Sequence, residues 1–315
     1  MQHWNSYWSK TKSLNSFAEG EHAQGYTGEI AEFWQTTFNS FPTSAAILDL
    51  ATGNGGLAVL AQQFGADFNI SASDAALIDP LTIFSPTDPC FATLEKIQFY
   101  GNTPSENLTF VNAQFDRVIS QFGFEYAEPI AALSEVNRVL KSGGEFTALI
   151  HHQDSFISTD CKIGLKILSQ LNNPDGLLAL LYDFGDFCQG VENKAQLTER
   201  QQAQFKEKNA NLLKKVKLQQ SECTSEDELE WYNLLVKELL PIIMDWRQTN
   251  TARVINTHEK LTAFQLRLQD QYEASWSSLD IENFKTIAEN EWVSFEFDVM
   301  KLETGILCWI IKAVK

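Results

Sequence analysis

Between Ala45 and Leu149 the sequence alternates short apolar segments with longer amphipathic ones, and this alternation constrains the fold more than any other feature. The apolar segments have the length of buried strands: AAILDL, DFNISASD, KIQFY, FDRVISQFG and GEFTALIHH. Segments such as GLAVLAQQF and PIAALSEVNRVLKSGG lie between them and have the period of a helix. Strands that alternate with helices in this way predict an α/β fold with a doubly wound, mostly parallel sheet.

The end of the sequence returns to strand character after a long helical stretch. WVSFEFDVMKL and ILCWIIKAVK are separated by a turn at Glu303–Gly305 and predict an antiparallel hairpin. We expect this terminal hairpin to complete the same sheet, which then has seven strands. Residues 155–290 are charged and helical in period, so they predict a large helical insertion. We thus expect an N-terminal segment (1–43), an α/β core (44–154), the helical insertion (155–290) and the C-terminal hairpin (291–315).

The N-terminal segment, residues 1–43, is rich in aromatic residues. Its second half, GEIAEFWQTTFNSF, places the aromatic side chains on one stripe and predicts a helix that packs on the sheet. The stretch from Trp4 to Tyr26 has no such period. We expect it to serve as a flap over a site.

Composition excludes several classes of function. The 315 residues carry a formal net charge of -17, which argues against a surface for nucleic acid. No apolar run is long enough to span a membrane, and the polar, aromatic N-terminus does not resemble a signal peptide. The five cysteines include no Cys-x-x-Cys pair, which is typical of free thiols in a reducing compartment and predicts neither disulfides nor a metal site. We therefore expect a cytoplasmic protein with no nucleic-acid or membrane partner.

The stretch ILDLATGNGG, residues 47–56, changes abruptly from strand-forming residues to glycine and small residues. A glycine-rich turn between a first parallel strand and its helix is typical of a site for an anionic or nucleotide-like ligand. Asp74 follows the second strand, where its carboxylate can accept both hydroxyls of a ribose. Gly53, Gly55 and Gly56 do not match the Gly-x-Gly-x-x-Gly spacing of dinucleotide-binding turns, so an NAD-dependent oxidoreductase is disfavoured.

The α/β portion resembles the class I S-adenosylmethionine-dependent methyltransferases. ILDLATGNGGLA is similar to the first motif of that family, Asp-x-Gly-x-Gly-x-Gly, with Ala51 at the place of the first glycine. The variant DLATG resembles the ubiquinone and menaquinone C-methyltransferase branch. FDRVISQFG and RVLKSGG resemble the family's fourth strand and the turn before its fifth strand. The resemblance implies an enzyme that binds S-adenosylmethionine in a Rossmann-like fold, whose seventh strand is inserted antiparallel between two others.

The resemblance also implies a set of cofactor-binding residues, namely Asp49, Ala51, Gly53, Gly55, Asp74, Ala75, Asn102 and Gln121. In the family the acid at Asp49 bonds the turn amides or reaches the methionine amine. Asp74 holds the ribose hydroxyls, Ala75 packs near the adenine, and Gln121 lies beside the methionine portion. Asn102 stands where the family has an acid that meets the adenine edge, and an amide oxygen can still accept that bond. Asp49 can instead be a local cap of the turn, and Asn102 an ordinary turn residue.

The acceptor side of the reaction is less constrained by the sequence. Methyl transfer needs a base only if the acceptor must lose a proton, and Glu125, His151 and His152 follow the fourth and fifth strands as catalytic candidates. A solvated or helix-capping role is equally consistent with each histidine. We expect a small organic acceptor, whose pocket lies between the helical insertion and the aromatic N-terminal segment. A non-catalytic protein that binds the cofactor and a methyltransferase that acts on proteins remain as alternatives.

Overall fold

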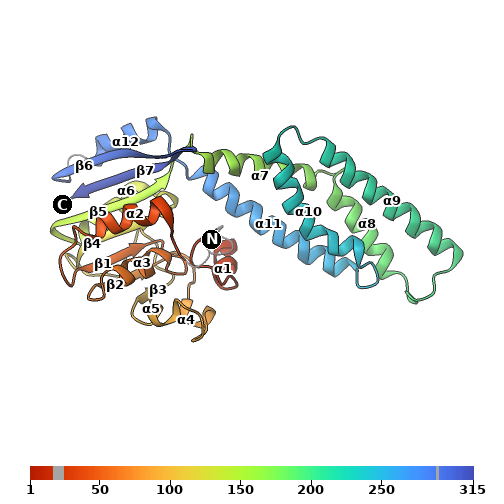
Figure 1. Cartoon of the computed structure of the whole chain (residues 1–315), viewed down its shortest axis with the longest axis horizontal. Helices are drawn as coiled ribbons and strands as arrows, with labels where there is room; N and C mark the ends of the chain where they lie inside the picture. The colour runs from red at the N-terminus through yellow and green to blue at the C-terminus, as the bar shows by residue number, and fades with distance from the viewer. Residues whose placement is uncertain (17–24, 289–290) are drawn as a thin grey trace. The chain divides into compact units, whose positions relative to one another are not determined.

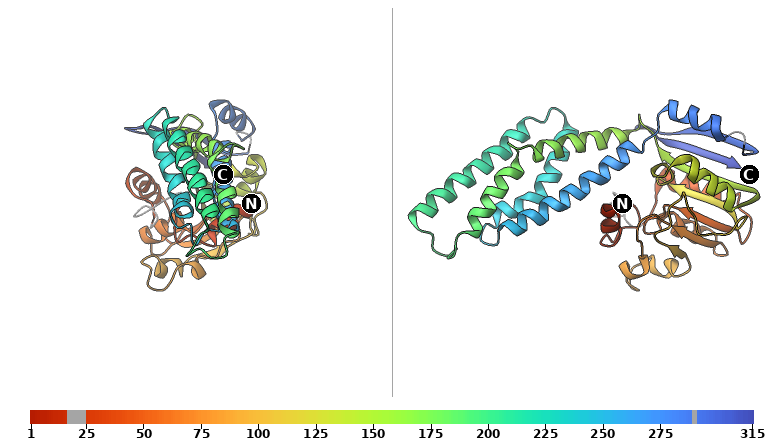
Figure 2. Two further views of the ribbon diagram at one scale, coloured as in Figure 1. Left: turned by 90° about the vertical axis from the view of Figure 1, so that its right-hand side faces the viewer. Right: turned by 180° about the vertical axis from the view of Figure 1, so that it is seen from behind.

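The computed structural model describes residues 1–16, 25–288 and 291–315, and the chain divides into two compact units. The α/β unit comprises Met1–Ser158 and Glu273–Lys315, and the helical unit comprises Thr159–Tyr272. Figures 1 and 2 show both units from three sides. The expected helical insertion is thus present, although it is shorter than the predicted 155–290.

The α/β unit is built on one seven-stranded sheet with the strand order β3-β2-β1-β4-β5-β7-β6 (Figure 1). The first five strands are parallel, and β7 lies antiparallel between β5 and β6. This arrangement confirms the predicted fold class and the terminal hairpin. The strands are β1 (Ala46–Leu50), β2 (Asn69–Ser73), β3 (Gln98–Tyr100), β4 (Phe115–Gln121), β5 (Leu140–His151), β6 (Ser294–Leu302) and β7 (Gly305–Val314).

The central strands are apolar on both faces, because each face packs against its own layer of helices. Leu48 and Val118 belong to the hydrophobic core on one face, together with side chains of α6 and α12. Ile47 and Ile119 belong to the core on the other face, with side chains of α2, α3 and α5. Successive strand residues point to opposite faces, so an unbroken apolar run is needed to fill both cores.

Helices of the α/β unit cover both faces of the sheet. They are α1 (Gln2–Trp8), α2 (Gly28–Phe38), α3 (Gly56–Phe64), α4 (Pro80–Ile83), α5 (Phe91–Leu94), the 3₁₀ helix η2 (Phe124–Tyr126), α6 (Pro129–Val139) and α12 (Ser278–Ala288). The position of α12 differs from the expected domain limits. Its residues Ile281 and Phe284 are buried in the sheet core next to Trp276, which is why α12 belongs to the α/β unit.

Gly143 and Gly144 do not end helix α6 as the sequence suggested. The helix ends at Val139, and strand β5 begins at the next residue. The pairing of β4 with β5 shifts register in this region, and Gly143, with φ +73, donates its N–H to the Lys315 carbonyl at 2.8 Å. Gly143 and Gly144 therefore lie in an irregular part of strand β5. The left-handed backbone of Gly143 favours glycine at that position.

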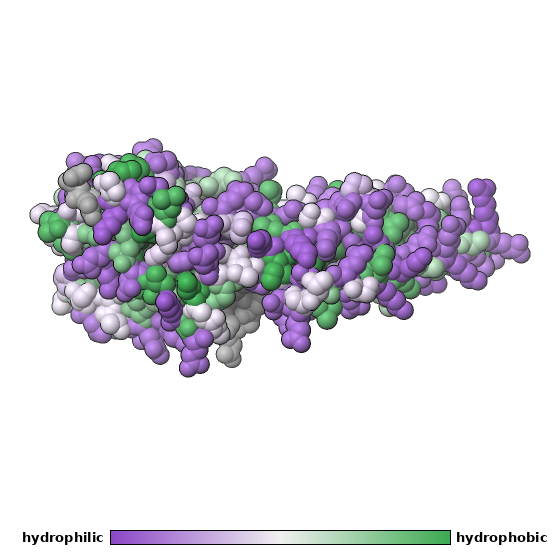
Figure 3. Space-filling view, turned by 90° about the horizontal axis from the view of Figure 1, so that it is seen from above, coloured by the Kyte–Doolittle hydropathy of each residue, from purple (hydrophilic) through white to green (hydrophobic). Residues whose placement is uncertain are grey.

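The helical unit consists of long helices, namely α7 (Phe156–Asn172), α8 (Leu177–Gln189), α9 (Glu199–Ser221), α10 (Glu226–Met244) and α11 (Thr251–Glu273). Aliphatic residues fill its interior, and the Trp231 ring packs where Gly164 leaves space for it. On the face drawn in Figure 3 its surface is mostly hydrophilic with scattered apolar residues. This pattern is typical of amphipathic helices that bury one stripe each.

Candidate functional site

A pocket of about 200 Å³ lies at the carboxyl ends of β1, β2, β3 and β4, where open α/β sheets bind ligands. Residues that follow each of these strands line it: Ala51 and Thr52, Asp74 and Ala75, Pro104 to Glu106, and Gln121 to Gly123. The N-terminal segment contributes Trp4 and Trp8 to the same lining. The acidic side chains in the lining are Asp74 and Glu106, which make this part of the pocket anionic.

The turn after β1 needs glycine, because aromatic side chains of the protein pack directly against its backbone. A Cβ at Gly53 would lie 2.5 Å from Trp8 Cζ2, and one at Gly55 would lie 3.0 Å from the Phe99 ring. Both glycines also have positive φ, of 57° and 94°, which L-residues with side chains rarely adopt. The close approach that we expected of a ligand at Gly53 and Gly55 is thus made by Trp8 and Phe99, and neither glycine lines the pocket.

Ala51 does line the pocket, and the space for its methyl group depends on Gly123. Its φ is +53, so the place where the family has glycine keeps the left-handed backbone but carries a methyl group. That methyl group is accommodated by Gly123, because a Cβ at position 123 would collide with the Ala51 Cβ. The departure from the family motif is therefore compensated at the end of β4.

Asp49 is 1% exposed in β1 and lies beneath the glycine turn. Its Oδ2 accepts hydrogen bonds from Thr52 Oγ1 at 2.6 Å and from the Ala58 N–H at 3.1 Å. Its Oδ1 is buried and has no hydrogen-bond partner among the described residues. Burial raises the pKa of Asp49 to about 7, against the lowering effect of these two hydrogen bonds. Asp49 therefore caps the turn with one oxygen and leaves the other free.

Asp74 also holds the turn, and it is more buried than the sequence suggested. Its Oδ2 accepts from the Gly53 N–H at 2.8 Å, and its Oδ1 accepts from the Ala76 N–H at 2.7 Å. Burial raises the pKa of Asp74 to about 6, although both hydrogen bonds lower it. Asp74 is thus a buried residue that ties the glycine turn to the loop after β2, while it also lines the pocket.

Gln121 ends β4 with its amide beside the pocket. Its Oε1 accepts a hydrogen bond from the Trp34 Nε1–H at 2.6 Å, which fixes the orientation of the amide. Its Nε2 is buried and has no partner among the described residues. Gln121 therefore offers an unused hydrogen-bond donor at the pocket wall.

Asn102 is not brought to the pocket. It is an exposed turn residue with φ +53, and its N–H donates to the Ala76 carbonyl at 3.0 Å. Ser105 and Glu106, a few residues further along the same loop, line the pocket instead. Asparagine tolerates the left-handed conformation better than most residues. The geometry therefore favours the interpretation of Asn102 as an ordinary turn residue.

Glu125 and His151 are buried behind the pocket wall, and neither lines it. Glu125 Oε1 accepts from the His151 N–H at 2.8 Å, and Glu125 Oε2 has no partner among the described residues. The His151 ring stacks on Phe122, with centroids 4.4 Å apart, and Phe122 in turn lines the pocket. Burial raises the pKa of Glu125 to about 8 and lowers the pKa of His151 to about 3, so both groups are neutral near pH 7.

His152 also lies away from the pocket. Its ring stacks on Trp309 with centroids 4.3 Å apart, and its Nδ1 accepts from the Asp154 N–H at 2.9 Å. It is 4% exposed, and burial lowers its pKa. The three side chains expected to be catalytic, Glu125, His151 and His152, are therefore buried, and none of them lines this pocket.

Two residues of the site, Asn54 and Tyr26, lie in segments that the sequence pointed to, but no role of its own was predicted for either residue. Asn54 is fully buried in the glycine turn, and its Nδ2 donates to the carbonyls of Thr11 and Ser13. Tyr26 lines the pocket, and burial followed by the charges of Asp49 and Glu125 raises its pKa. Asn54 occupies a variable position of the motif, and Tyr26 stood in a segment without period, so neither carried a sequence signal. Residues 17–24 of that predicted flap lie outside the described residues.

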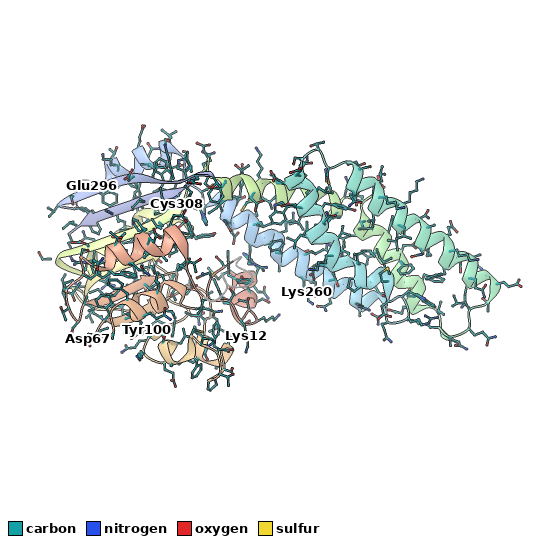
Figure 4. The ribbon with its side chains drawn as sticks, viewed as in Figure 1. Lys12, Asp67, Tyr100, Lys260, Glu296 and Cys308 are labelled. Carbon is teal, nitrogen blue, oxygen red and sulfur yellow. The ribbon has the colours of Figure 1, made fainter. Side chains whose placement is uncertain are left out.

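The described part of the chain offers neither a membrane-spanning helix nor a cluster of metal ligands. Over residues 1–16, 25–288 and 291–315, no helix is both long and apolar enough to cross a membrane. In the same part of the chain, no three His, Cys, Asp or Glu side chains gather in a way that could hold a metal ion. Cys308, labelled in Figure 4, lies on β7 directly opposite His151 on the neighbouring strand β5. It is a free, buried thiol.

Comparison with known proteins agrees with this architecture. Residues 48–148 match the family model described as "Methyltransferase domain". No curated protein matches the chain. Similar solved structures include a complex of the Haloferax volcanii Trm112 methyltransferase activator with a methyltransferase (19% identity, 47% of this chain and 60% of that one, TM-score 0.33).

Two other solved structures are similar to the chain. The PH0226 protein of Pyrococcus horikoshii is 21% identical over 48% of this chain and 68% of that one, with a TM-score of 0.37. A SAM-dependent methyltransferase of Aquifex aeolicus is 10% identical over 90% of this chain and 88% of that one, with a TM-score of 0.43. At these scores no inference rests on the structures, and the family match carries the assignment. Residues 48–148 therefore match a methyltransferase domain, the kind of enzyme domain for which S-adenosylmethionine is the methyl donor.

Proposed function

We propose that the pocket binds S-adenosylmethionine and that the chain transfers the methyl group to a small organic acceptor. The observation that carries this proposal is a pair of buried polar atoms without partners among the described residues, Asp49 Oδ1 and Gln121 Nε2. They belong to neighbouring parallel strands, β1 and β4. Gln121 lines the pocket, whereas Asp49 lies beneath the glycine turn and outside the lining. Buried polar groups are rarely left unpaired, so an acceptor and a donor here fit a ligand that carries both an amine and a carboxylate, as the methionine portion of the cofactor does.

The other lining residues fit the remainder of the cofactor. Each Asp74 oxygen uses one lone pair on a backbone N–H, and a second lone pair on each remains for a ribose hydroxyl. We propose Ala75 and Ser105 as the neighbours of the adenine, in place of the exposed Asn102. Ala51 and Gly123 keep the wall between them free of bulk.

The chain's own residues have a modest chemical task. The bound cofactor supplies a methyl group that is already activated for displacement. The aromatic rings of Trp4, Phe122 and Tyr126 line the pocket, and we propose that they exclude water around the bound ligand. We propose that Glu125 and His151 act only by supporting Phe122 and Tyr126, whose rings both contact the His151 ring.

The identity of the acceptor is a separate proposal. An aromatic pocket wall suits a flat or apolar molecule, and the DLATG motif resembles the ubiquinone and menaquinone C-methyltransferases, so quinol precursors are the first acceptors to assay. We retain the prediction that the helical insertion, expected at residues 155–290, selects the acceptor. A cytoplasmic location also stays a prediction.

The test is a transfer assay with methyl-labelled cofactor and a cell extract separated into small molecules and proteins. We expect the label in the small-molecule fraction, with quinol precursors assayed individually. Label in the protein fraction would overturn the acceptor class. Cofactor binding without transfer to either fraction would instead identify a non-catalytic binding protein.

A further inference from the structure

Residues 1–16, the first part of the N-terminal segment, are attached to both sides of the pocket. Asn5 Oδ1 accepts a hydrogen bond at 2.8 Å from the Leu77 N–H, in the loop that follows β2. The Trp4 ring meets the Tyr126 ring edge to face, with centroids 5.9 Å apart, in η2 after β4. Because β1 lies between β2 and β4, the segment crosses the end of β1, and Figure 1 shows α1 at that end of the strands.

The glycine turn holds the same segment through Asn54. The Asn54 Nδ2 donates hydrogen bonds to the carbonyl of Thr11 at 3.1 Å and to that of Ser13 at 3.0 Å. Two amide hydrogens thus satisfy two backbone acceptors that burial would otherwise leave unpaired. Lys12, labelled in Figure 4, lies between these residues in sequence and pairs with Asp88 on the surface.

The indoles of this segment face the half of the pocket that the turn forms. Trp8 covers Gly53 and packs with Ala76 and Ile78, just beyond Asp74. Trp4 stacks on Trp8 with centroids 6.3 Å apart, and both rings line the pocket. A ligand in the pocket beside Ala51 and Thr52 would therefore lie against these rings, whatever the methyl acceptor is.

We infer that residues 1–16 belong to the cofactor site itself, with the Trp4 and Trp8 indoles against the bound S-adenosylmethionine. The inference rests on the proposed function, and it gives the first part of the expected flap, Trp4 to Tyr26, a place in the cofactor site. Asn54 is then a positioning residue, because it fixes the segment on the turn without lining the pocket.

The test is a calorimetric titration of the full-length protein with S-adenosylhomocysteine. We expect Trp4→Ala to weaken binding about tenfold, because the loss of one aromatic contact of about 1.4 kcal/mol corresponds to that factor. Trp4→Phe should restore most of the affinity, since it keeps a ring. Trp fluorescence of the wild type should change on titration, and this change should be smaller in Trp4→Phe.

A milder pair of variants keeps the test decisive if Trp4→Ala does not fold. Asn5→Ala removes the bond to Leu77 and should weaken binding several-fold, whereas Asn39→Ala, at an exposed position on the end of α2, should not. Wild-type affinity in both Trp4→Ala and Asn5→Ala, with a higher acceptor KM, would overturn the inference. Absence of binding to the wild type would instead refute the proposed function.

Discussion

Glu125→Gln tests the state of the buried carboxyl group most sharply, because glutamine copies the protonated form of glutamate. The amide oxygen of the substituted side chain can still accept the His151 N–H, and its amide nitrogen takes the place of the unpartnered Oε2. Glu125 has its pKa raised by burial from 4.5 to about 8. Between these two pKa values the folded protein keeps a proton that the unfolded chain releases, so stability falls as the pH rises.

The magnitude follows from this linkage. At about 1.4 kcal/mol per pH unit, wild-type protein loses about 5 kcal/mol of unfolding free energy from this group between pH 4.5 and pH 8. The variant carries no titrating group at this position and escapes that loss. We therefore expect Glu125→Gln to exceed the wild type by less than about 1 kcal/mol at pH 5, to exceed it increasingly up to pH 8, and to keep a constant excess above that.

The assay is urea denaturation of both proteins from pH 5 to pH 9. The helical unit is unchanged by the substitution and contributes equally to both curves, as do Asp49 and Asp74 to a first approximation. Glu32→Gln, at an exposed position of α2, controls for the change in net charge. Parallel curves for wild type and Glu125→Gln would refute the assignment of a buried, neutral Glu125.

Three further substitutions test other contacts of the site. Asp74→Ala should lower the thermal unfolding midpoint of the ligand-free protein as well as cofactor affinity, because each backbone N–H of Gly53 and Ala76 left unpaired costs about 1–3 kcal/mol; an unchanged midpoint would contradict this. Gly123→Ala should destabilise by about 1–3 kcal/mol through its collision with Ala51, and Ala51→Gly in the same chain should restore most of the loss in denaturation experiments. His152→Gln should cost about 1 kcal/mol of stability through the lost stacking on Trp309, while the rate of methyl transfer stays unchanged; a large loss of kcat would show that His152 is catalytic.

The sheet could be predicted from the sequence because its signals are local. Continuous apolar runs such as AILDL fill both cores, so their residues had to be strands of a covered sheet. The place of the pocket followed from topology, since residues after parallel strands meet at one edge, and Ala51, Asp74 and Gln121 are found there.

The remaining features depend on contacts between distant parts of the chain. Nothing local in Trp8 indicates that it packs on Gly53, 45 positions away. Glu125 follows a strand but does not line the pocket: its carboxylate accepts the His151 N–H, and the Phe122 and Tyr126 rings pack on the His151 ring. Helix α12 has the same helical period as the insertion before it, and only its packing on Trp276 assigns it to the sheet.

The central claim is that this pocket is the cofactor site, and a calorimetric titration with S-adenosylhomocysteine tests it most directly. We predict saturable binding at one site per chain with micromolar affinity, or about -8 kcal/mol. Ala75→Trp, which fills the pocket, should abolish it, and Ala66→Trp, at an exposed position before β2, should not. No saturable binding by the wild type, or equal binding by Ala75→Trp, would contradict the account.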